Sequence, residues 1–325
     1  MQLNKIIFGG KKYIVFFTII FLLLFFGVIL VYFGYNESFY IDNNLINSIF
    51  KGITLLGDAR FFIIVFAVFY FGIDKKFGKN LLYIFLLSAY INTFIKSFVK
   101  DPRPTTNIEN GKPIENTFGF PSAHAQISVS FWGYIFYNFK DHLKKYFVQV
   151  LCIFFIIIVS VSRLIIGVHD VIEVFGGIII GLFVLEFFIL IKPRFKGFEN
   201  VPLQIKLPFF GLFAFVLWFS MIYLFPGSFK EFSQLGGIFF SALVFIPIEE
   251  KFVDYTTEFF DLKKRFIVSL ISIILIFVAF FLIDYILAKI ILLDYLSIFI
   301  EYIILGFFIL FFIPFILKIA INHYY

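Results

Sequence analysis

A series of long apolar runs, separated by short polar segments, constrains this chain more than any other feature of its sequence. The first run covers residues 13–33 and contains no charged side chain. A helix of about 20 apolar residues is long enough to cross the hydrocarbon core of a bilayer. Because 62% of the 325 residues are hydrophobic and only 15% are charged, the chain lacks the polar side chains that would cover a water-soluble fold of this size. The sequence therefore predicts an all-α integral membrane protein.

Ten of these runs are predicted to form transmembrane helices. The first is longer than the apolar core of a signal peptide, and no small-residue cleavage site follows it, so we interpret it as an uncleaved helix. Residues 36–60 mix polar and apolar side chains and are predicted to lie at the membrane interface. The predicted spans cover residues 13–33, 61–71, 81–99, 125–139, 146–162, 171–191, 207–224, 235–247, 266–287 and 296–319.

The basic residues predict the orientation of these helices. They account for a net charge of +6, and they lie in short runs beside apolar segments, as residues that face anionic lipid do, rather than as a nucleic-acid-binding surface. If the N-terminus lies in the cytoplasm, most of the 27 lysines and arginines fall in cytoplasmic segments, as the positive-inside rule requires. We therefore predict a multi-pass protein with both termini in the cytoplasm.

Three polar clusters lie between residues 96 and 173, each at the end of a predicted helix. A basic residue at the centre of a membrane helix costs about 2.5 to 3.5 kcal/mol, so basic residues at helix ends should face water or a ligand. The predicted topology puts all three clusters on the non-cytoplasmic face. They consist of Lys96 with Arg103-Pro104; Pro121-Ser122-Ala123-His124; and Ser162-Arg163 with His169, Asp170 and Glu173.

The residue types in these clusters indicate chemistry on an anion. Lys96, Arg103 and Arg163 bring three positive charges to one face. Histidines beside them indicate proton transfer or nucleophilic chemistry, because histidine alone has an unperturbed side-chain pKa near neutral pH. His169 and Glu173 are four residues apart, so on a helical turn the carboxylate would be close enough to accept a hydrogen bond from the imidazole. Together these features predict a site with a nucleophile, a base and an orienting acid.

Two other features are interpreted as structural. Cys152 is the single cysteine, so it has no partner for an internal disulfide or for a cysteine-based metal site, and we interpret it as a packing residue. The acidic residues Glu249, Glu250, Asp254 and Glu258 precede a basic run. We interpret them as part of a mixed-charge cytoplasmic loop rather than as a metal site.

The three clusters, in this order and with these internal spacings, resemble the three-part signature of the type 2 phosphatidic acid phosphatase (PAP2) superfamily, in its membrane lipid-phosphatase branch. The resemblance implies a six-helix catalytic membrane core over residues 1–199. Residues 200–325 would then form a C-terminal extension of about four transmembrane helices.

The resemblance also implies a role for each residue of the clusters. His169 would attack phosphorus and form a phosphohistidine, Glu173 would orient it, and His124 would protonate the leaving group and then activate water. No metal and no other cofactor is implied. The phosphoryl oxygens would be held by Lys96, Arg103, Ser122, Ala123 and Arg163, which would supply preorganised positive charge and hydrogen bonds.

The chain departs from the family pattern at two positions. Glu173 stands where the family usually has aspartate, and neighbouring Asp170 is an alternative orienting acid. Ala123 stands where glycine is usual, and alanine would strain the turn if this position required a positive φ. Ser122 has a structural alternative, as the N-cap of the following helix.

The function implied by the resemblance is metal-independent hydrolysis of a lipid phosphate or diphosphate through a phosphohistidine. Phosphatidic acid, an isoprenyl diphosphate and a long-chain-base phosphate are all possible substrates. One alternative is a lipid phosphotransferase that uses the same site, and another is a non-catalytic protein that binds lipid phosphates. The expected partners are a lipid phosphate substrate and membrane lipids, with no nucleic acid, and the sequence indicates no oligomeric state.

Overall fold

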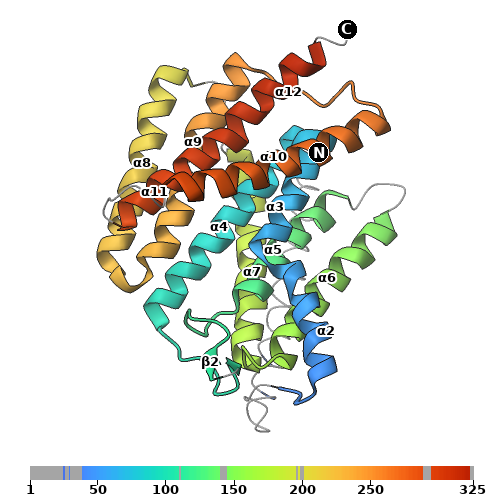
Figure 1. Ribbon diagram of the computed structural model, residues 1–325, viewed down its shortest axis with the longest axis vertical. Coiled ribbons are helices and arrows are strands. Elements are labelled where there is room, and N and C mark those ends of the chain that lie inside the picture. The colour runs from blue at the N-terminus through green and yellow to red at the C-terminus, as the bar shows by residue number, and fades with distance from the viewer. Residues whose placement is uncertain are drawn as a thin grey trace, which may run out of the picture. The chain divides into compact units, whose positions relative to one another are not determined.

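The computed structural model describes residues 25, 29, 39–109, 111–139, 145–194, 197, 201–287 and 294–322 (Figure 1). Most of these residues are helical, and the sheet among them has only two short strands. Seven helices are long and apolar enough to cross a membrane, or eight if the neighbouring stretches Asn44–Gly57 and Ala59–Ile73 form one broken span. The prediction of an all-α, multi-pass membrane protein is confirmed.

The predicted number of ten spans, divided into six and four, stays a prediction. Nearly all of the first predicted span, residues 13–33, lies outside the described residues. The helix predicted over residues 125–139 is present but has only 16 residues, which is shorter than a full membrane span.

The chain packs as two compact units, each of which combines separate stretches of sequence. Unit 1 contains the described residues up to Gly57 together with Val99–Leu185, and unit 2 contains Asp58–Phe98 together with the described residues from Glu186 onward. The predicted division into a catalytic core and an extension after residue 199 concerns function and stays a prediction.

Unit 1 holds α2 (Asn44–Thr54), η1 (Leu55–Gly57), β1 (Ile108–Glu109), β2 (Lys112–Pro113), α5 (Ala123–Asn138), α6 (Lys145–Ile165) and most of α7 (Val171–Ile191). Unit 2 holds α3 (Ala59–Ala67), the π-helical stretch η2 (Val68–Ile73), nearly all of α4 (Lys75–Val99), α8 (Leu203–Leu224), η4 (Pro226–Ser228), α9 (Phe229–Phe252), α10 (Leu262–Leu287), α11 (Asp294–Phe307), a second π-helical stretch η5 (Phe308–Phe312) and α12 (Ile313–Asn322).

The helices generally extend beyond the predicted apolar runs, although α7 has the predicted bounds. The largest difference is α9, which was predicted to end at Pro247 but continues to Phe252. Proline removes only its own N–H from the helical hydrogen bonds, and membrane helices tolerate it because neighbouring groups satisfy the freed backbone. Apolar runs therefore locate these helices well but do not locate their polar ends.

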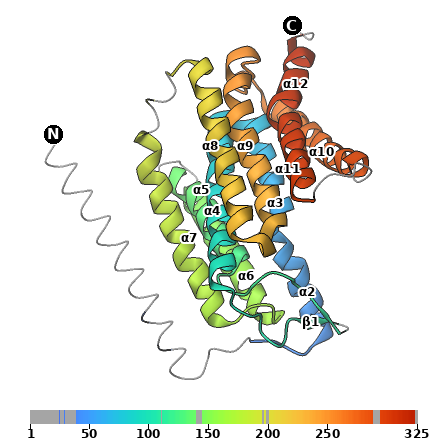
Figure 2. The same ribbon diagram turned by 90° about the vertical axis from the view of Figure 1, so that its left-hand side faces the viewer.

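Close packing between α5 and α7 organises unit 1 (Figure 2). A Cβ atom added at Gly177 would lie 2.6 Å from the carbonyl oxygen of Ser122, and one at Gly181 would lie 2.6 Å from that of Gln126. Two glycines four residues apart therefore let the backbone of α7 approach the start of α5, as their spacing predicts. α6 packs against α5 on a stacked pair of rings, Trp132 and Phe155, whose centroids are 4.5 Å apart.

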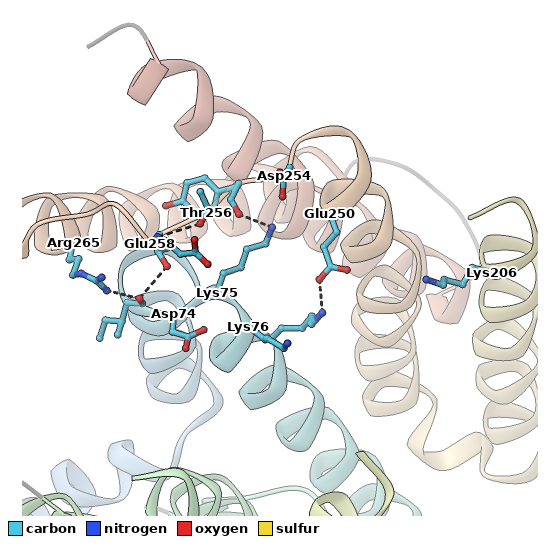
Figure 3. Close-up of a pocket in the computed structure, with 13 residues that line it drawn as sticks. Asp74, Lys75, Lys76, Lys206, Glu250, Asp254, Thr256, Glu258 and Arg265 are labelled. Atoms are coloured by element: carbon cyan, nitrogen blue, oxygen red, sulfur yellow. Dashed lines mark hydrogen bonds and ion pairs between the residues drawn. The ribbon is translucent and has the colours of Figure 1, made fainter. Parts of the chain in front are cut away.

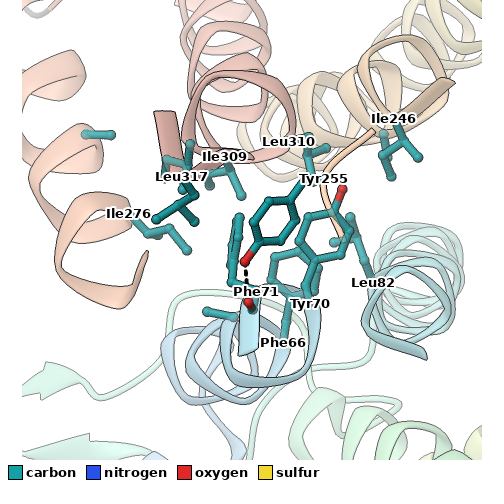
Figure 4. Close-up of a cluster of buried hydrophobic side chains, with 14 of the residues drawn as sticks. Phe66, Tyr70, Phe71, Leu82, Ile246, Tyr255, Ile276, Ile309, Leu310 and Leu317 are labelled. Carbon is teal, nitrogen blue, oxygen red and sulfur yellow. Dashed lines mark hydrogen bonds between the residues drawn. The ribbon is translucent and has the colours of Figure 1, made fainter. Parts of the chain in front are cut away.

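An aromatic cluster forms the buried core of unit 2 (Figure 4). Phe66 stacks on Tyr70 with ring centroids 5.1 Å apart. Tyr255, in the segment between α9 and α10, inserts its ring here and donates a hydrogen bond of 2.5 Å to the carbonyl oxygen of Phe71. This bond satisfies a backbone group in the π-helical stretch, where regular helical hydrogen bonding is interrupted.

The polar end of unit 2 contains a charged hollow of about 640 Å³ (Figure 3). Glu250, near the end of α9, forms an ion pair of 2.5 Å with Lys79 of α4. Glu249 is fully buried and forms an ion pair with Lys75. The prediction that these two acids lie in a loop is wrong, because both are in α9. Their ion pairs with α4 hold the helix beyond its apolar part.

Candidate active site

The second and third polar clusters and Arg103 come together in unit 1. Arg103 lies in the loop that precedes β1, and Ser122, Ala123 and His124 lie at the start of α5. Arg163 lies in the last turn of α6 and His169 in the turn before α7. A hydrogen bond of 2.9 Å from the Ser122 backbone N–H to the carbonyl oxygen of Glu173 ties the start of α5 to the start of α7.

A capping box at the start of α7 holds His169. The Oδ1 atom of Asp170 accepts a hydrogen bond of 2.8 Å from the backbone N–H of Glu173, and Oε2 of Glu173 accepts one of 3.2 Å from the backbone N–H of Asp170. This reciprocal pair satisfies two N–H groups at the helix start. The same Oε2 atom lies 2.5 Å from Nδ1 of His169. One carboxylate therefore caps the helix and orients the imidazole.

This geometry corrects the predicted reason for the contact between His169 and Glu173. His169 precedes α7, so the two side chains meet across the capping turn and not along one helical face. Asp170, the alternative orienting acid, uses its carboxylate to cap α7. Burial raises the pKa of the Asp170 carboxyl. Both His169 and Glu173 are only 1% exposed, so their contact is shielded from solvent.

Gly119 lies directly against this carboxylate. A Cβ atom at Gly119 would overlap Oε1 of Glu173. The backbone N–H of Gly119 donates a hydrogen bond of 2.8 Å to the carbonyl oxygen of Asp101, which fixes the loop in this position. A residue without a side chain is therefore required for the loop to pass behind the acid.

Arg103 lies against the Nε2 side of the buried imidazole. Its Nη1 atom is 2.7 Å from Nε2 of His169 and also donates a 2.7 Å hydrogen bond to the carbonyl oxygen of Val168. Its Nε and Nη2 atoms donate hydrogen bonds of 2.8 and 2.9 Å to the carbonyl and hydroxyl oxygens of Thr117. These bonds hold the guanidinium rigidly beside the ring nitrogen that Glu173 does not contact.

Arg163 and Arg103 both pair with Glu115, which lies in the same loop as Arg103. Glu115 accepts a hydrogen bond of 2.7 Å from Nη2 of Arg103 through Oε2, and Oε1 forms an ion pair with Arg163. Burial would raise the pKa of the Glu115 carboxyl, but Arg163, Arg103 and His124 lower it to about 2. Arg163 is 2% exposed and donates a further hydrogen bond of 2.8 Å to the hydroxyl of Thr54. The two arginines thus form a partly enclosed anion site that an acid of the protein occupies.

Ser122 and Ala123 adopt conformations suited to the start of a helix. Ser122 precedes α5, but its side chain makes no capping hydrogen bond, and its fully buried hydroxyl has no partner among the described residues. Buried hydroxyls without a partner are rare and are expected to serve a ligand or water. Ala123 is the first helical residue of α5. The strain that a positive φ would impose on alanine does not arise.

His124 is half-buried at the start of α5 and packs beside the turn η1. A Cβ atom at Gly57 would lie 2.8 Å from Cδ2 of His124 and would also overlap Val159. The imidazole is close enough to Glu115 to contribute to its lowered pKa. His124 therefore borders the anion site.

Lys96 belongs to unit 2, where it lies in the last turn of α4 and is 7% exposed. Its predicted role in phosphate binding stays a prediction. The described residues contain no cluster of three or more His, Cys, Asp or Glu side chains arranged to hold a metal ion.

Sequence reasoning missed the acid that occupies the anion site. The loop contains the tripeptide Ile-Glu-Asn twice, at Ile108-Glu109-Asn110 and Ile114-Glu115-Asn116. Only Glu115 reaches the arginines, whereas Glu109 pairs with Lys51. Local sequence does not distinguish the two acids. Gly119 and Thr54 were missed for the same reason, because their roles depend on contacts between distant segments.

Comparisons with known proteins find a family model and several relatives that match this chain. Residues 77–196 match the model of the PAP2 superfamily. Human sphingosine-1-phosphate phosphatase 2 is 26% identical over 199 residues, which cover 60% of this chain and 49% of that protein. Phosphatidylglycerophosphatase B of Bacillus subtilis is 29% identical over 166 residues, which cover 48% of this chain and 76% of that protein.

The alignments with the human and mouse sphingosine-1-phosphate phosphatases span only about half the length of those relatives, 49% and 54%. Among solved structures, the transmembrane PAP2-type phosphatidylglycerolphosphate phosphatase from Bacillus subtilis matches with 26% identity and a TM-score of 0.41, covering 48% of this chain and 81% of that chain.

Proposed function

We propose that this chain, whose residues 77–196 match the model of the PAP2 superfamily, is a membrane phosphatase that hydrolyses a lipid phosphate at the site around His169. The observation that carries this proposal is the arrangement of the imidazole. Nδ1 of His169 faces Glu173, and Nε2 faces the guanidinium of Arg103. A histidine that donates its Nδ1 proton to a carboxylate has an unprotonated Nε2. This nitrogen accepts a hydrogen bond from Arg103, and it becomes the nucleophile when a phosphoryl group takes that donor.

The proposed reaction has two steps. Nε2 of His169 attacks phosphorus and forms an N–P bond while the P–O bond to the lipid breaks, and His124 gives a proton to the leaving alkoxide. Water then attacks phosphorus, His124 accepts a proton from this water, and the N–P bond breaks to release inorganic phosphate. Arg103 and Arg163 stabilise the charge on the phosphoryl oxygens in both transition states.

The remaining residues of the site have supporting roles in this proposal. The hydroxyl of Ser122, which has no partner among the described residues, donates to a phosphoryl oxygen. The backbone N–H of Ala123 lies in the first turn of α5 and also donates to the anion, as N–H groups at helix N-termini do. Lys96 adds positive charge, as the family resemblance implies. No step requires a metal ion.

The proposed substrate is an amphiphile that carries a terminal phosphate. The names of two relatives, sphingosine-1-phosphate phosphatase 2 and phosphatidylglycerophosphatase B, each specify a lipid phosphate. Many large apolar side chains are exposed on the long helices, so a lipid tail would remain in the bilayer while its headgroup reaches the arginines. We propose that the site faces the non-cytoplasmic side, with both termini in the cytoplasm.

Phosphate release tests this proposal directly. Purified full-length protein is incubated with phosphatidic acid, an isoprenyl diphosphate and sphingosine 1-phosphate in the presence of a metal chelator. We expect phosphate release from at least one of them, its loss in His169→Gln, and its retention in Glu109→Gln, a control in the same unit. Full activity of H169Q would contradict the assignment of the nucleophile.

The same assay separates the alternative functions. A lipid phosphotransferase would move labelled phosphate to an added alcohol or lipid hydroxyl, whereas a hydrolase yields only inorganic phosphate. A protein that binds these lipids and turns over none of them would be non-catalytic.

A further inference from the structure

We propose that Glu115 is a positioning residue that occupies the phosphoryl site when the substrate is absent, and that the substrate binds by displacing its carboxylate from Arg103 and Arg163. The identity of the incoming group rests on the proposed function. The displacement itself rests on the contacts of Glu115.

Glu115 meets the two arginines as a phosphoryl group would. Its Oε2 atom accepts a 2.7 Å hydrogen bond from Arg103, and its Oε1 atom pairs with Arg163. Carboxylates and phosphates both accept charge-assisted hydrogen bonds from guanidinium groups, and Glu115 gives one oxygen to each arginine. The two groups therefore cannot both bind these donors at once.

Burial explains why the two arginines need such an acid. The side chains of Arg163 and Arg103 are 2% and 9% exposed, so neither charge is well solvated. Buried charges without a counter-ion are strongly destabilising, and two guanidinium groups this close would also repel each other. Glu115 supplies the counter-ion until a phosphate replaces it, which keeps both arginines directed at the phosphoryl site.

The backbone of Glu115 is fixed independently of its side chain. The buried amide of Asn107 donates a 2.9 Å hydrogen bond to the Glu115 carbonyl oxygen and accepts one of 3.1 Å from its N–H. The side chain of Glu115 is 27% exposed. The carboxylate can therefore rotate toward solvent while the loop stays in place.

The exchange has a defined kinetic consequence. When a competing group fills the site, the apparent affinity for ligand equals the intrinsic affinity multiplied by the fraction of time that the site is free. If Glu115 fills the site about nine-tenths of the time, its removal increases the affinity about tenfold. Glu115 leaves before the chemical step, so KM falls on its removal while kcat changes little.

Binding of inorganic phosphate tests this inference without any turnover. The detergent-solubilised full chain is titrated with phosphate by calorimetry and by thermal unfolding, for the wild type, Glu115→Gln and Glu109→Gln. The control E109Q changes the other Ile-Glu-Asn acid of the loop. We expect E115Q to bind phosphate about tenfold more tightly and to gain more thermal stability from it than the wild type, whereas E109Q matches the wild type.

Equal or weaker phosphate binding by E115Q would overturn the inference. If E115Q does not fold, Glu115→Asp replaces it, because the shorter side chain keeps the charge but cannot bridge both arginines, and its phosphate affinity should also rise. Tighter binding by E115Q in a protein that hydrolyses no lipid phosphate would contradict the proposed function and leave the displacement intact.

Discussion

Oε2 of Glu173 lies 2.5 Å from Nδ1 of His169 and also accepts a hydrogen bond from the backbone N–H of Asp170. The longer side chain of glutamate makes both contacts from the third position of α7, where a capping box places a glutamate. Glutamate at this position, where the family usually has aspartate, therefore suits the capping turn at the start of α7.

This relationship predicts that shortening the acid impairs the enzyme. Glu173→Asp should lose the contact with Nδ1, and Glu173→Gln should lose the negative charge that stabilises the imidazolium. We expect kcat to fall about 10²- to 10⁴-fold in E173Q, and by a smaller factor in E173D. Steady-state rates of phosphate release measure both effects. An E173D variant with a higher kcat than the wild type would contradict this account of the acid.

A second prediction concerns the glycine behind the acid. In Gly119→Ala the new Cβ atom would overlap Oε1 of Glu173, so the carboxylate must move. We expect kcat to fall at least about tenfold. The control is Gly52→Ala in α2, where a Cβ atom meets nothing within 4 Å. Equal activities of G119A, G52A and the wild type would show that the close approach of Gly119 does not position the acid.

A third prediction concerns the contact between α5 and α7. Gly181→Val would force the α7 backbone away from the carbonyl oxygen of Gln126, which overpacks the interface by about 1 to 3 kcal/mol. Thermal unfolding should therefore begin at a lower temperature. Gly211→Ala is the control, because its Cβ atom would make only ordinary contacts of 3.6 Å or more. Unchanged thermal stability of G181V would rule out close packing at this position.

The lowered pKa of Glu115 predicts how stability depends on pH. An unfolded glutamate titrates near pH 4.3, and in the folded protein the pKa of Glu115 is about 2. Its ion pairs therefore contribute their full stabilisation above about pH 4.3, and this contribution is lost as the pH falls toward 2. Relative to the wild type, E115Q should be less stable at pH 7, and the difference should shrink below pH 4. Parallel thermal unfolding curves of the two proteins at several pH values measure this, and a constant difference would contradict the assignment.

The sequence predicts the helices of this protein and the polar clusters that the structure brings together around His169, but not the acid that pairs with the two arginines. Apolar runs locate α7 correctly. Glu115 could not be found in the same way, since choosing between two identical tripeptides requires the positions of both arginines.

Two further differences arise from the same limit of local patterns. Strain at Ala123 is expected only for a positive φ, and the sign of φ depends on where α5 begins. The buried ion pair between Lys75 and Glu249 extends α9 beyond its apolar part, and the two partners are far apart in the sequence.

Trapping the covalent intermediate tests the central claim most directly. Purified protein is mixed with a lipid phosphate that carries a radioactive phosphoryl group, quenched in alkali within milliseconds to seconds, and digested for mass spectrometry. We predict an acid-labile label on the peptide that contains His169, no label in H169Q, and a longer-lived label when His124 is replaced by asparagine. A label on another residue, or continuous phosphate release with no labelled protein at any time, would contradict nucleophilic catalysis by His169.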